Sequence, residues 1–127
     1  MLDNASLIAF LATTRPEEST RFYRHTLGLL FVEDDMNHIV FDANGTILRI
    51  QRVDQHTPAS HVVLSWEVEN IVSTVQGLRS AGVKFERMPG LEQDANDVWV
   101  AYDGTLVAWF KDPDGNLLSL SEHAQRP

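Results

Sequence analysis

The sequence predicts an α+β fold in which one order of elements, a strand, a helix and then several antiparallel strands, occurs twice along a chain of 127 residues. Helix-start signals follow a strand-like segment at Pro16 and again at Asn70, and strong turn signals at Asn44-Gly45 and Pro113 to Asn116 separate later strands. We therefore expect a single domain over residues 1–127, with a first module at about 4–56 and a second at about 60–123.

The first module begins with a strand of small and apolar residues at Ser6–Thr13. A helix is predicted over Pro16–Leu27, because proline suits the first helical turn and the two glutamates after it suit the positive end of the helix dipole. Gly28 should end this helix, with Phe22 and Tyr23 directed toward a core. Further strands are predicted at Leu29–Glu33, His38–Phe41 and Thr46–Val53, the last two joined by a hairpin turn.

The second module repeats this order with little residue identity to the first. A strand is predicted over His61–Val68, and a helix then opens at Glu69-Asn70 and ends at Gly82, with apolar residues at helical spacing between them. A polar loop at 89–97 and a tight turn at Asp112–Asn116 lie between later strands. These further strands are predicted at Val83–Arg87, Val98–Tyr102, Leu106–Lys111 and Leu117–Ser121.

Composition excludes several classes of function. The chain has no cysteine, which removes disulfides, thiolate metal sites and cysteine nucleophiles. The net charge of −8 opposes binding to a phosphate backbone, so no nucleic-acid partner is expected. The N-terminal segment has neither a basic region nor a long apolar stretch, and no membrane partner is expected either. A cytoplasmic protein is the natural expectation.

Two motifs resemble one known family. The stretch Phe22-Tyr23-Arg24-His25-Thr26-Leu27-Gly28-Leu29 resembles the "FY…LGL" helix end of the vicinal oxygen chelate superfamily, which contains glyoxalases, bleomycin resistance proteins and extradiol dioxygenases. The stretch Trp109 to Asn116 resembles the "F-x-DPDGN" turn before the last strand of that family. The resemblance spans about residues 6–122 and implies paired βαβββ modules that form a curved mixed sheet around a cavity, with helices on the outer face.

The resemblance also implies four metal-binding positions, normally held by His or Glu. In this chain they fall on Ile8, Arg49, Val63 and Ser119. Two of these side chains are hydrocarbons, one is a fixed positive charge and one is a weak neutral oxygen, so no metal site and no cofactor are predicted. Metal-dependent glyoxalase or dioxygenase activity is therefore not expected. His61 would reach the cavity only if the strand register were wrong by one pair.

The other histidines offer no ligand set at metal-binding spacing. His25, His38, His56 and His123 are expected to be solvated.

Strand alternation assigns side chains to the cavity. The predicted ligand-binding residues are Phe10, Arg49, Gln51, Ser65, Trp99, Tyr102, Trp109 and Ser119. Their neighbours Leu48, Ile50, Leu64, Trp66, Leu118 and Leu120 should pack beneath the helices. Arg49 should meet either an internal carboxylate or an anionic group of a ligand, because an unpaired guanidinium in a concave site is costly. The aromatic residues could stack on a planar ligand or simply pack.

Three functions remain open from the sequence. The first is a metal-free protein that sequesters an aromatic or cationic small molecule, the cation being favoured by the acidic surface. The second is an enzyme of the same family, of lyase, isomerase or dioxygenase type, which uses acid/base side chains such as Tyr102, His61 or Arg49, or a metal site of another kind. The third is a module that binds a protein partner. A homodimer is expected, by resemblance to single-domain members of the family, and the cavity is completed either within the chain or by a second copy.

Overall fold

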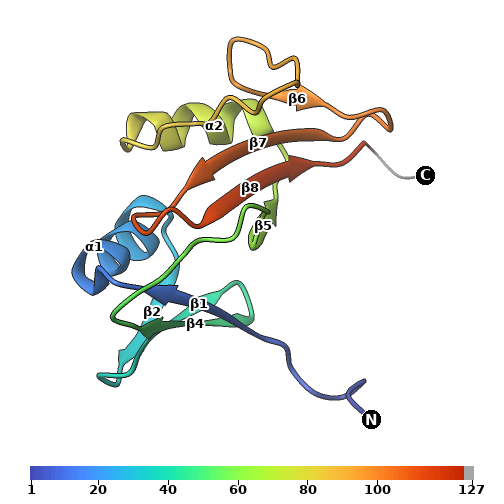
Figure 1. The fold of residues 1–127 in the computed structure, drawn as a ribbon. Coiled ribbons are helices and arrows are strands. Elements are labelled where there is room, and N and C mark those ends of the chain that lie inside the picture. The colour runs from blue at the N-terminus through green and yellow to red at the C-terminus, as the bar shows by residue number, and fades with distance from the viewer. Residues whose placement is uncertain (125–127) are drawn as a thin grey trace. The chain divides into compact units, whose positions relative to one another are not determined.

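The fold is that of a computed structural model in which residues 1–124 are described. The last three residues of the domain expected over 1–127 lie outside the described residues. The chain divides into two compact units, Met1–Thr57 and Pro58–Pro127, each with one four-stranded mixed sheet (Figure 1). These units are called the first and the second module below. The predicted α+β class with a repeated strand-helix-strand order is confirmed.

The sheet of the first module has the strand order β1-β4-β3-β2. Strands β1 and β4 run parallel, whereas β3 is antiparallel to both β4 and β2. The elements in chain order are β1 (Ile8–Thr13), α1 (Pro16–Arg21), a π-helical turn η1 (Phe22–Thr26), β2 (Leu30–Asp34), β3 (His38–Ala43) and β4 (Thr46–Arg52).

The helix predicted over Pro16–Leu27 begins where expected but changes its hydrogen bonding at Phe22. There the backbone N–H of Leu27 donates to the carbonyl of Phe22, five residues earlier, at 2.9 Å. The predicted helix is confirmed over 16–26, but its last turn is wider than an α-helix, a difference that apolar spacing in the sequence does not reveal. Gly28 ends the segment with a φ of 78°, and Tyr23 is fully buried against Phe41 at a ring-centroid distance of 6.0 Å.

The predicted hairpin turn between β3 and β4 is confirmed. Asn44 and Gly45 have φ values of 53° and 100°, the positive pair that a two-residue turn between twisted strands requires. The carboxylate of Asp42 accepts a hydrogen bond of 2.6 Å from the backbone N–H of Gly45. This turn sets the register of the hairpin and with it the face on which each β4 side chain lies.

The core of the first module lies on one face of its sheet. Leu48 and Ile50 are each 1% exposed, as predicted for residues that pack on the helix side. Because side chains alternate along a strand, Arg49 between them projects from the opposite face. The buried residues of this face are Leu11, Ile39, Phe41, Leu48 and Ile50, together with Tyr23.

The sheet of the second module has the strand order β5-β8-β7-β6, with β5 and β8 parallel and the other pairs antiparallel. Figure 1 shows α2 running beside β7. The elements are β5 (Leu64–Glu67), α2 (Ile71–Ser80), β6 (Trp99–Val100), β7 (Leu106–Lys111) and β8 (Leu117–Glu122).

Helix α2 forms where predicted. The side chain of Asn70 caps it by accepting a hydrogen bond of 3.0 Å from the backbone N–H of Ser73, and Gly82 follows it with a φ of 97°. Ile71 and Val75 are fully buried. The carboxylate of Glu122 accepts the N–H of Ile71 at 2.9 Å, which ties the start of the helix to the end of β8.

Two predicted strands share a single edge of the sheet and are shorter than expected. Of Val83–Arg87 only Phe85 makes a bridge, to Phe110, and of Val98–Tyr102 only Trp99 and Val100 form a strand. The edge of β7 has room for one neighbour, so each segment occupies a part of it. Pro89 lies between the two segments and has no backbone N–H to donate to a neighbouring strand, and the chain leaves the sheet there.

The side chain of Gln93 replaces part of the missing ladder. Its amide nitrogen donates to the carbonyls of Glu86 at 2.9 Å and Asp97 at 2.7 Å, and its oxygen accepts from the N–H of Met88 at 2.6 Å. These bonds satisfy backbone groups that a regular strand would have paired.

Two other strands begin later than predicted. The strand expected over His61–Val68 is confined to Leu64–Glu67, because its partner β8 begins only at Leu117, whose carbonyl accepts the N–H of Val63 at 3.0 Å. The first strand begins at Ile8 and not at Ser6, which agrees with the start of its partner β4 opposite Ile47. A strand ends where its hydrogen-bonding partner ends.

None of the helices in residues 1–124 has the length and apolar character needed to cross a membrane.

Candidate functional site

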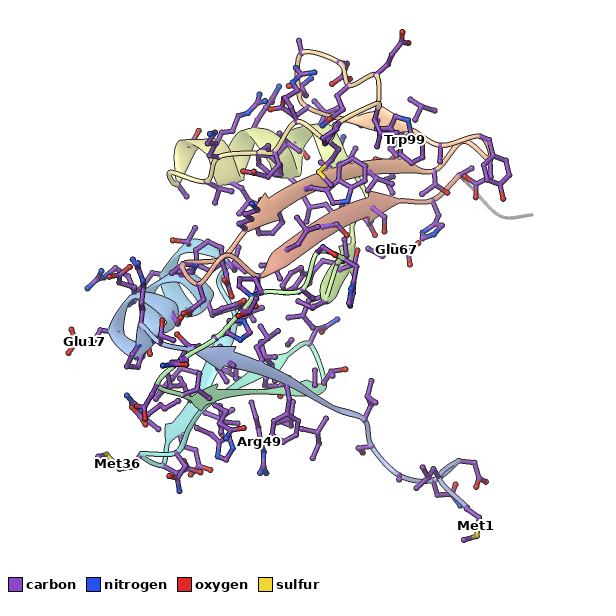
Figure 2. The ribbon with its side chains drawn as sticks, viewed as in Figure 1. Met1, Glu17, Met36, Arg49, Glu67 and Trp99 are labelled. Carbon is purple, nitrogen blue, oxygen red and sulfur yellow. The ribbon has the colours of Figure 1, made fainter. Side chains whose placement is uncertain are left out.

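Each sheet has one face that carries most of the buried core, and we call the other the open face, on which Val40, Trp109 and Ser119 are nevertheless buried. On the open face of the first module Arg49 lies in a middle strand, with Phe10 of β1 opposite it on one side and Val40 of β3 on the other. Figure 2 shows the side chain of Arg49 on the side of β4 that points away from α1. Register therefore brings together two of the predicted site residues, Phe10 and Arg49.

Arg49 has no ion pair within the part of the chain that the structure describes. Its Nε is buried and has no hydrogen-bond partner. The charge of Arg49 does act on the carboxyl of Asp35. The pKa of Asp35 is held below its ordinary value mainly by a hydrogen bond from the backbone N–H of His38, and the positive charge of Arg49 lowers this pKa further. Of the two alternatives for Arg49, the internal carboxylate is thus not found among residues 1–124.

The surroundings of Arg49 are apolar and accessible. Phe10 is 55% exposed and meets the ring of His38 edge-on, with the centroids 5.9 Å apart. Gln51 lies one residue pair further along the same face, opposite Ala12. Ile8 is also exposed on this face. Arg49 and Phe10 thus place a positive charge beside an exposed aromatic ring.

The open face of the second module brings four predicted site residues together. Ser65, Ser119 and Trp109 lie side by side on β5, β8 and β7. The hydroxyl of Ser119 donates a hydrogen bond of 2.8 Å to the hydroxyl of Ser65. Trp99 of β6 lies next to Trp109, with ring centroids 6.0 Å apart and an angle of 37° between the planes. Two indoles and two hydroxyls thus form one continuous patch, which we call the Trp-Ser patch.

Tyr102 does not join this patch. It lies beyond the end of β6 in a turn, and its exposed fraction of 103% means that nothing covers its ring. The prediction relied on a strand through Tyr102, and that strand ends at Val100.

The residues at the four implied metal positions do not fit a metal ion. Register pairs Arg49 with Phe10 and Ser119 with Ser65, while Ile8 and Val63 lie one pair earlier on the same faces. Shifting the alignment by one pair toward the carboxyl ends of the strands replaces Ile8 by Phe10 and Val63 by Ser65, neither of which is a usual metal ligand. Within residues 1–124 no three His, Asp or Glu side chains converge in a way that could hold a metal. His61 lies outside β5 and is exposed.

His123 and Glu67, which are far apart in the sequence, form a contact. Nδ1 of His123 lies 2.5 Å from Oε1 of Glu67, and the histidine is at the same time exposed to solvent, as expected. Glu67 ends β5 and His123 follows β8, and since these neighbours are parallel, their carboxyl ends meet at the same edge of the sheet. No local pattern in the sequence indicates this contact, because it depends on which strands pair.

Two depressions flank the open face of the second module. One, of about 750 Å³, is lined by Glu67, Val68, Glu69, Glu122, His123 and Ala124. The other, of about 460 Å³, includes Leu117, Lys111 and Glu86, the last two separated by 3.8 Å. Ligand sites are usually concave, with aromatic side chains and a few placed polar groups; the Trp-Ser patch supplies the aromatic side chains, and the larger depression beside it is mainly polar.

Residues 6–120 match the model of the Glyoxalase/Bleomycin resistance protein/Dioxygenase superfamily. The chain is 29% identical over 121 residues to the uncharacterized protein YraH of Bacillus subtilis (strain 168), an alignment that covers 82% of this chain and 87% of that protein.

Solved structures share the fold at low identity. A putative glyoxalase family protein from Bacillus anthracis superposes with a TM-score of 0.74 at 17% identity, covering 94% of this chain and 95% of that one. A lactoylglutathione lyase from Agrobacterium tumefaciens superposes with a TM-score of 0.70 at 16% identity, covering 96% of both chains. Likeness at this identity establishes the fold and leaves the chemistry to the side chains.

Proposed function

The chain belongs to the Glyoxalase/Bleomycin resistance protein/Dioxygenase superfamily, and from this premise we propose that it is a metal-free binding protein for a small planar organic molecule. The observation that carries the proposal is the Trp-Ser patch, in which Trp99 and Trp109 adjoin the hydroxyls of Ser65 and Ser119. Aromatic side chains with a few placed polar groups are typical of small-molecule sites.

The two kinds of side chain supply different parts of recognition. Trp99 is only partly buried and offers an indole to a planar ring, a contact of about 0.5–1.5 kcal/mol beyond the area that it buries. Ser119 donates its hydroxyl hydrogen to Ser65, which leaves the hydroxyl hydrogen of the exposed Ser65 free to point at a ligand. Stacking on Trp99 would thus contribute most of the binding affinity, and the hydroxyl of Ser65 would fix the orientation of the bound ligand.

Charge favours a cationic ligand at this patch. Glu67, Glu69 and Glu122 line one flanking depression, and the whole chain carries a net charge of −8. A positive group is attracted both to these carboxylates and to the face of an indole. Sequestration of an aromatic cation is the finer form of the proposal, and a homodimer is part of it.

The experiment uses proflavine, a planar aromatic cation, and follows quenching of tryptophan fluorescence. We expect saturable binding that Trp99→Ala weakens about tenfold, the loss that corresponds to one stacking contact. Tyr102→Ala is the matched aromatic control and should bind proflavine like the unaltered protein, because Tyr102 lies outside the patch. Equal weakening in both variants, or no saturable binding, contradicts the proposal.

Two further measurements test the remaining parts. Metal analysis of the purified protein should give no stoichiometric divalent ion, and added Zn²⁺, Ni²⁺ or Mn²⁺ should leave the melting temperature unchanged. A metal that is bound in a one-to-one ratio and lost in Ser119→Ala overturns the metal-free assignment. Light scattering should give the mass of a dimer, twice the 14.3 kDa of one chain.

The contact between Glu67 and His123 favours one second candidate, an enzyme of the same family that acts by proton transfer. A carboxylate on Nδ1 orients the ring and leaves Nε2 to take or give a proton at a substrate in the adjacent depression. The test is a panel of carbon acids in D₂O, with deuterium incorporation measured by NMR. Incorporation that is lost in His123→Gln but kept in His56→Gln would establish this enzyme; absence of incorporation across the panel rejects it.

A further inference from the structure

We propose that the open face of the first module binds the carboxylate of a small aromatic acid, with Arg49 holding the carboxylate and Phe10 contacting the ring. This goes beyond the proposed function, which concerns the Trp-Ser patch of the second module and favours a cation. The observation behind it is the buried Nε of Arg49, which has no hydrogen-bond partner.

Like Arg21 and Arg24, Arg49 has no ion pair with a carboxylate among residues 1–124, but of these three it is the one whose Nε is buried without a hydrogen-bond partner. Arg52, three residues further along the same strand, also has a buried Nε without a partner, but its guanidinium pairs with Asp34 at 2.5 Å. Other arginines that meet a carboxylate are Arg15, Arg79 and Arg87. A partly desolvated guanidinium without an anion is unfavourable, and an incoming carboxylate would supply two parallel hydrogen bonds.

The carboxylate of Asp35, whose pKa the charge of Arg49 lowers, already accepts hydrogen bonds from its own turn. Its Oδ1 accepts the backbone N–H groups of Asn37 at 3.0 Å and His38 at 2.6 Å, so it shapes the turn before β3. Leaving that turn to reach Arg49 would expose two backbone donors without partners. Asp35 therefore influences Arg49 only at longer range.

The neighbours of Arg49 define the size of the ligand. Phe10 and Val40 lie opposite Arg49 on the two adjacent strands, and neighbouring strands are about 4.8 Å apart. Phe10 is 55% exposed, so its ring is open to a ligand while its edge rests on His38. An acid whose carboxylate is bonded directly to an aromatic ring spans this distance. A long-chain acid would leave Phe10 unused.

The experiment compares three probes with the same ring system and different charge: 2-naphthoate, 2-naphthamide and 2-naphthylmethylamine. Each is titrated into isotope-labelled protein while the Nε–H signal of arginine and the phenylalanine ring signals are followed by NMR. We expect saturable shifts at Arg49 and Phe10 with the acid only, because the amide and the amine lack the two negatively charged oxygens that accept two parallel hydrogen bonds from a guanidinium.

Substitutions separate a specific site from general attraction. Arg49→Gln should weaken 2-naphthoate binding about tenfold or more, the loss of a hydrogen-bonded charge pair. Arg21→Gln makes the same change of charge at an exposed position of α1 and should leave binding unchanged. Both variants are first checked for an unaltered amide spectrum outside the substituted residue, so that misfolding is excluded.

Three results overturn the proposal. The first is equal affinity for the acid and the amide, and the second is equal loss in Arg49→Gln and Arg21→Gln. The third is an Arg49 signal that shifts with protein concentration and ignores 2-naphthoate, since a carboxylate of a second copy would then occupy the guanidinium. Trp99→Ala tests the proposed function independently, so failure of either idea leaves the other standing.

Discussion

Ser119 donates a hydrogen bond of 2.8 Å to Ser65 across the parallel pair of β5 and β8. Ser119 is 5% exposed, whereas Ser65 lies open to solvent. Ser119 occupies one of the four positions at which the family resemblance implies a metal ligand, and Ser65 lies beside it. The two hydroxyls bond to each other there without a metal.

This serine pair should contribute little to stability and more to ligand binding. Ser119→Ala removes one neutral hydrogen bond, worth about 1 kcal/mol of unfolding free energy, and Ser65 can bond to water in its place. A double-mutant cycle with Ser65→Ala, measured by urea unfolding, should give a coupling energy of about 0.5–1 kcal/mol. Strict additivity of the two substitutions would show that the bond contributes nothing.

Arg49→Met should make the protein more stable. The substitution keeps an unbranched side chain over Phe10 and Val40 and removes a guanidinium whose Nε is buried without a partner. We expect a gain of about 1 kcal/mol in unfolding free energy. Arg52→Met is the matched control and should lower stability, because it deprives Asp34 of its ion pair. A loss in Arg49→Met as large as in Arg52→Met would mean that Arg49 has a partner in solution.

Gly115→Ala should be destabilising. Gly115 has a φ of 85°, and a Cβ added to it would lie 3.2 Å from Cγ of Pro58, so both backbone strain and a close contact oppose the change. The expected loss is about 1–2 kcal/mol. Gly77→Ala in α2 is the control, since nothing lies within 4 Å of the added Cβ and alanine favours a helix by up to about 1 kcal/mol. Thermal unfolding of the two variants should therefore shift in opposite directions.

Protonation of Asp35 should lower the free energy of unfolding at acidic pH. Hydrogen bonds from backbone N–H groups, that of His38 first, hold the pKa of its carboxyl below the ordinary value of 3.8. A group with a lowered pKa stabilises the folded state at pH values above its unfolded pKa, and this contribution is lost as the pH falls through the folded pKa. The stability difference between the unaltered protein and Asp35→Asn should thus be constant at neutral pH and shrink below about pH 4. A difference that grows on acidification contradicts this account.

Most of the fold was predictable because it depends on local signals. Asn44-Gly45, Gly28 and Gly82 have the positive φ values that mark turns and helix ends, and alternation along β4 correctly separated Leu48 and Ile50 from Arg49. The errors occurred where a segment depends on its partner. The strand expected at 83–87 does not form, because this segment and β6 both pair with the same edge of β7. No local sequence pattern shows that two segments share one edge.

The candidate site was predictable only in part for the same reason. Alternation placed Phe10 with Arg49 and Ser65 with Ser119, since side-chain direction follows from strand period. The contact of Glu67 with His123 was missed, because the two residues are far apart in the chain and meet only through the parallel pairing of β5 and β8.

By itself the sequence determined the kind of fold and the turns that join its strands. Each of these depends on residue type and on neighbours within one turn or strand. The tertiary structure alone decided that Arg49 has no carboxylate within residues 1–124 and that His123 does have one. Partners of this kind come from distant segments, and only strand pairing brings those segments within hydrogen-bonding distance.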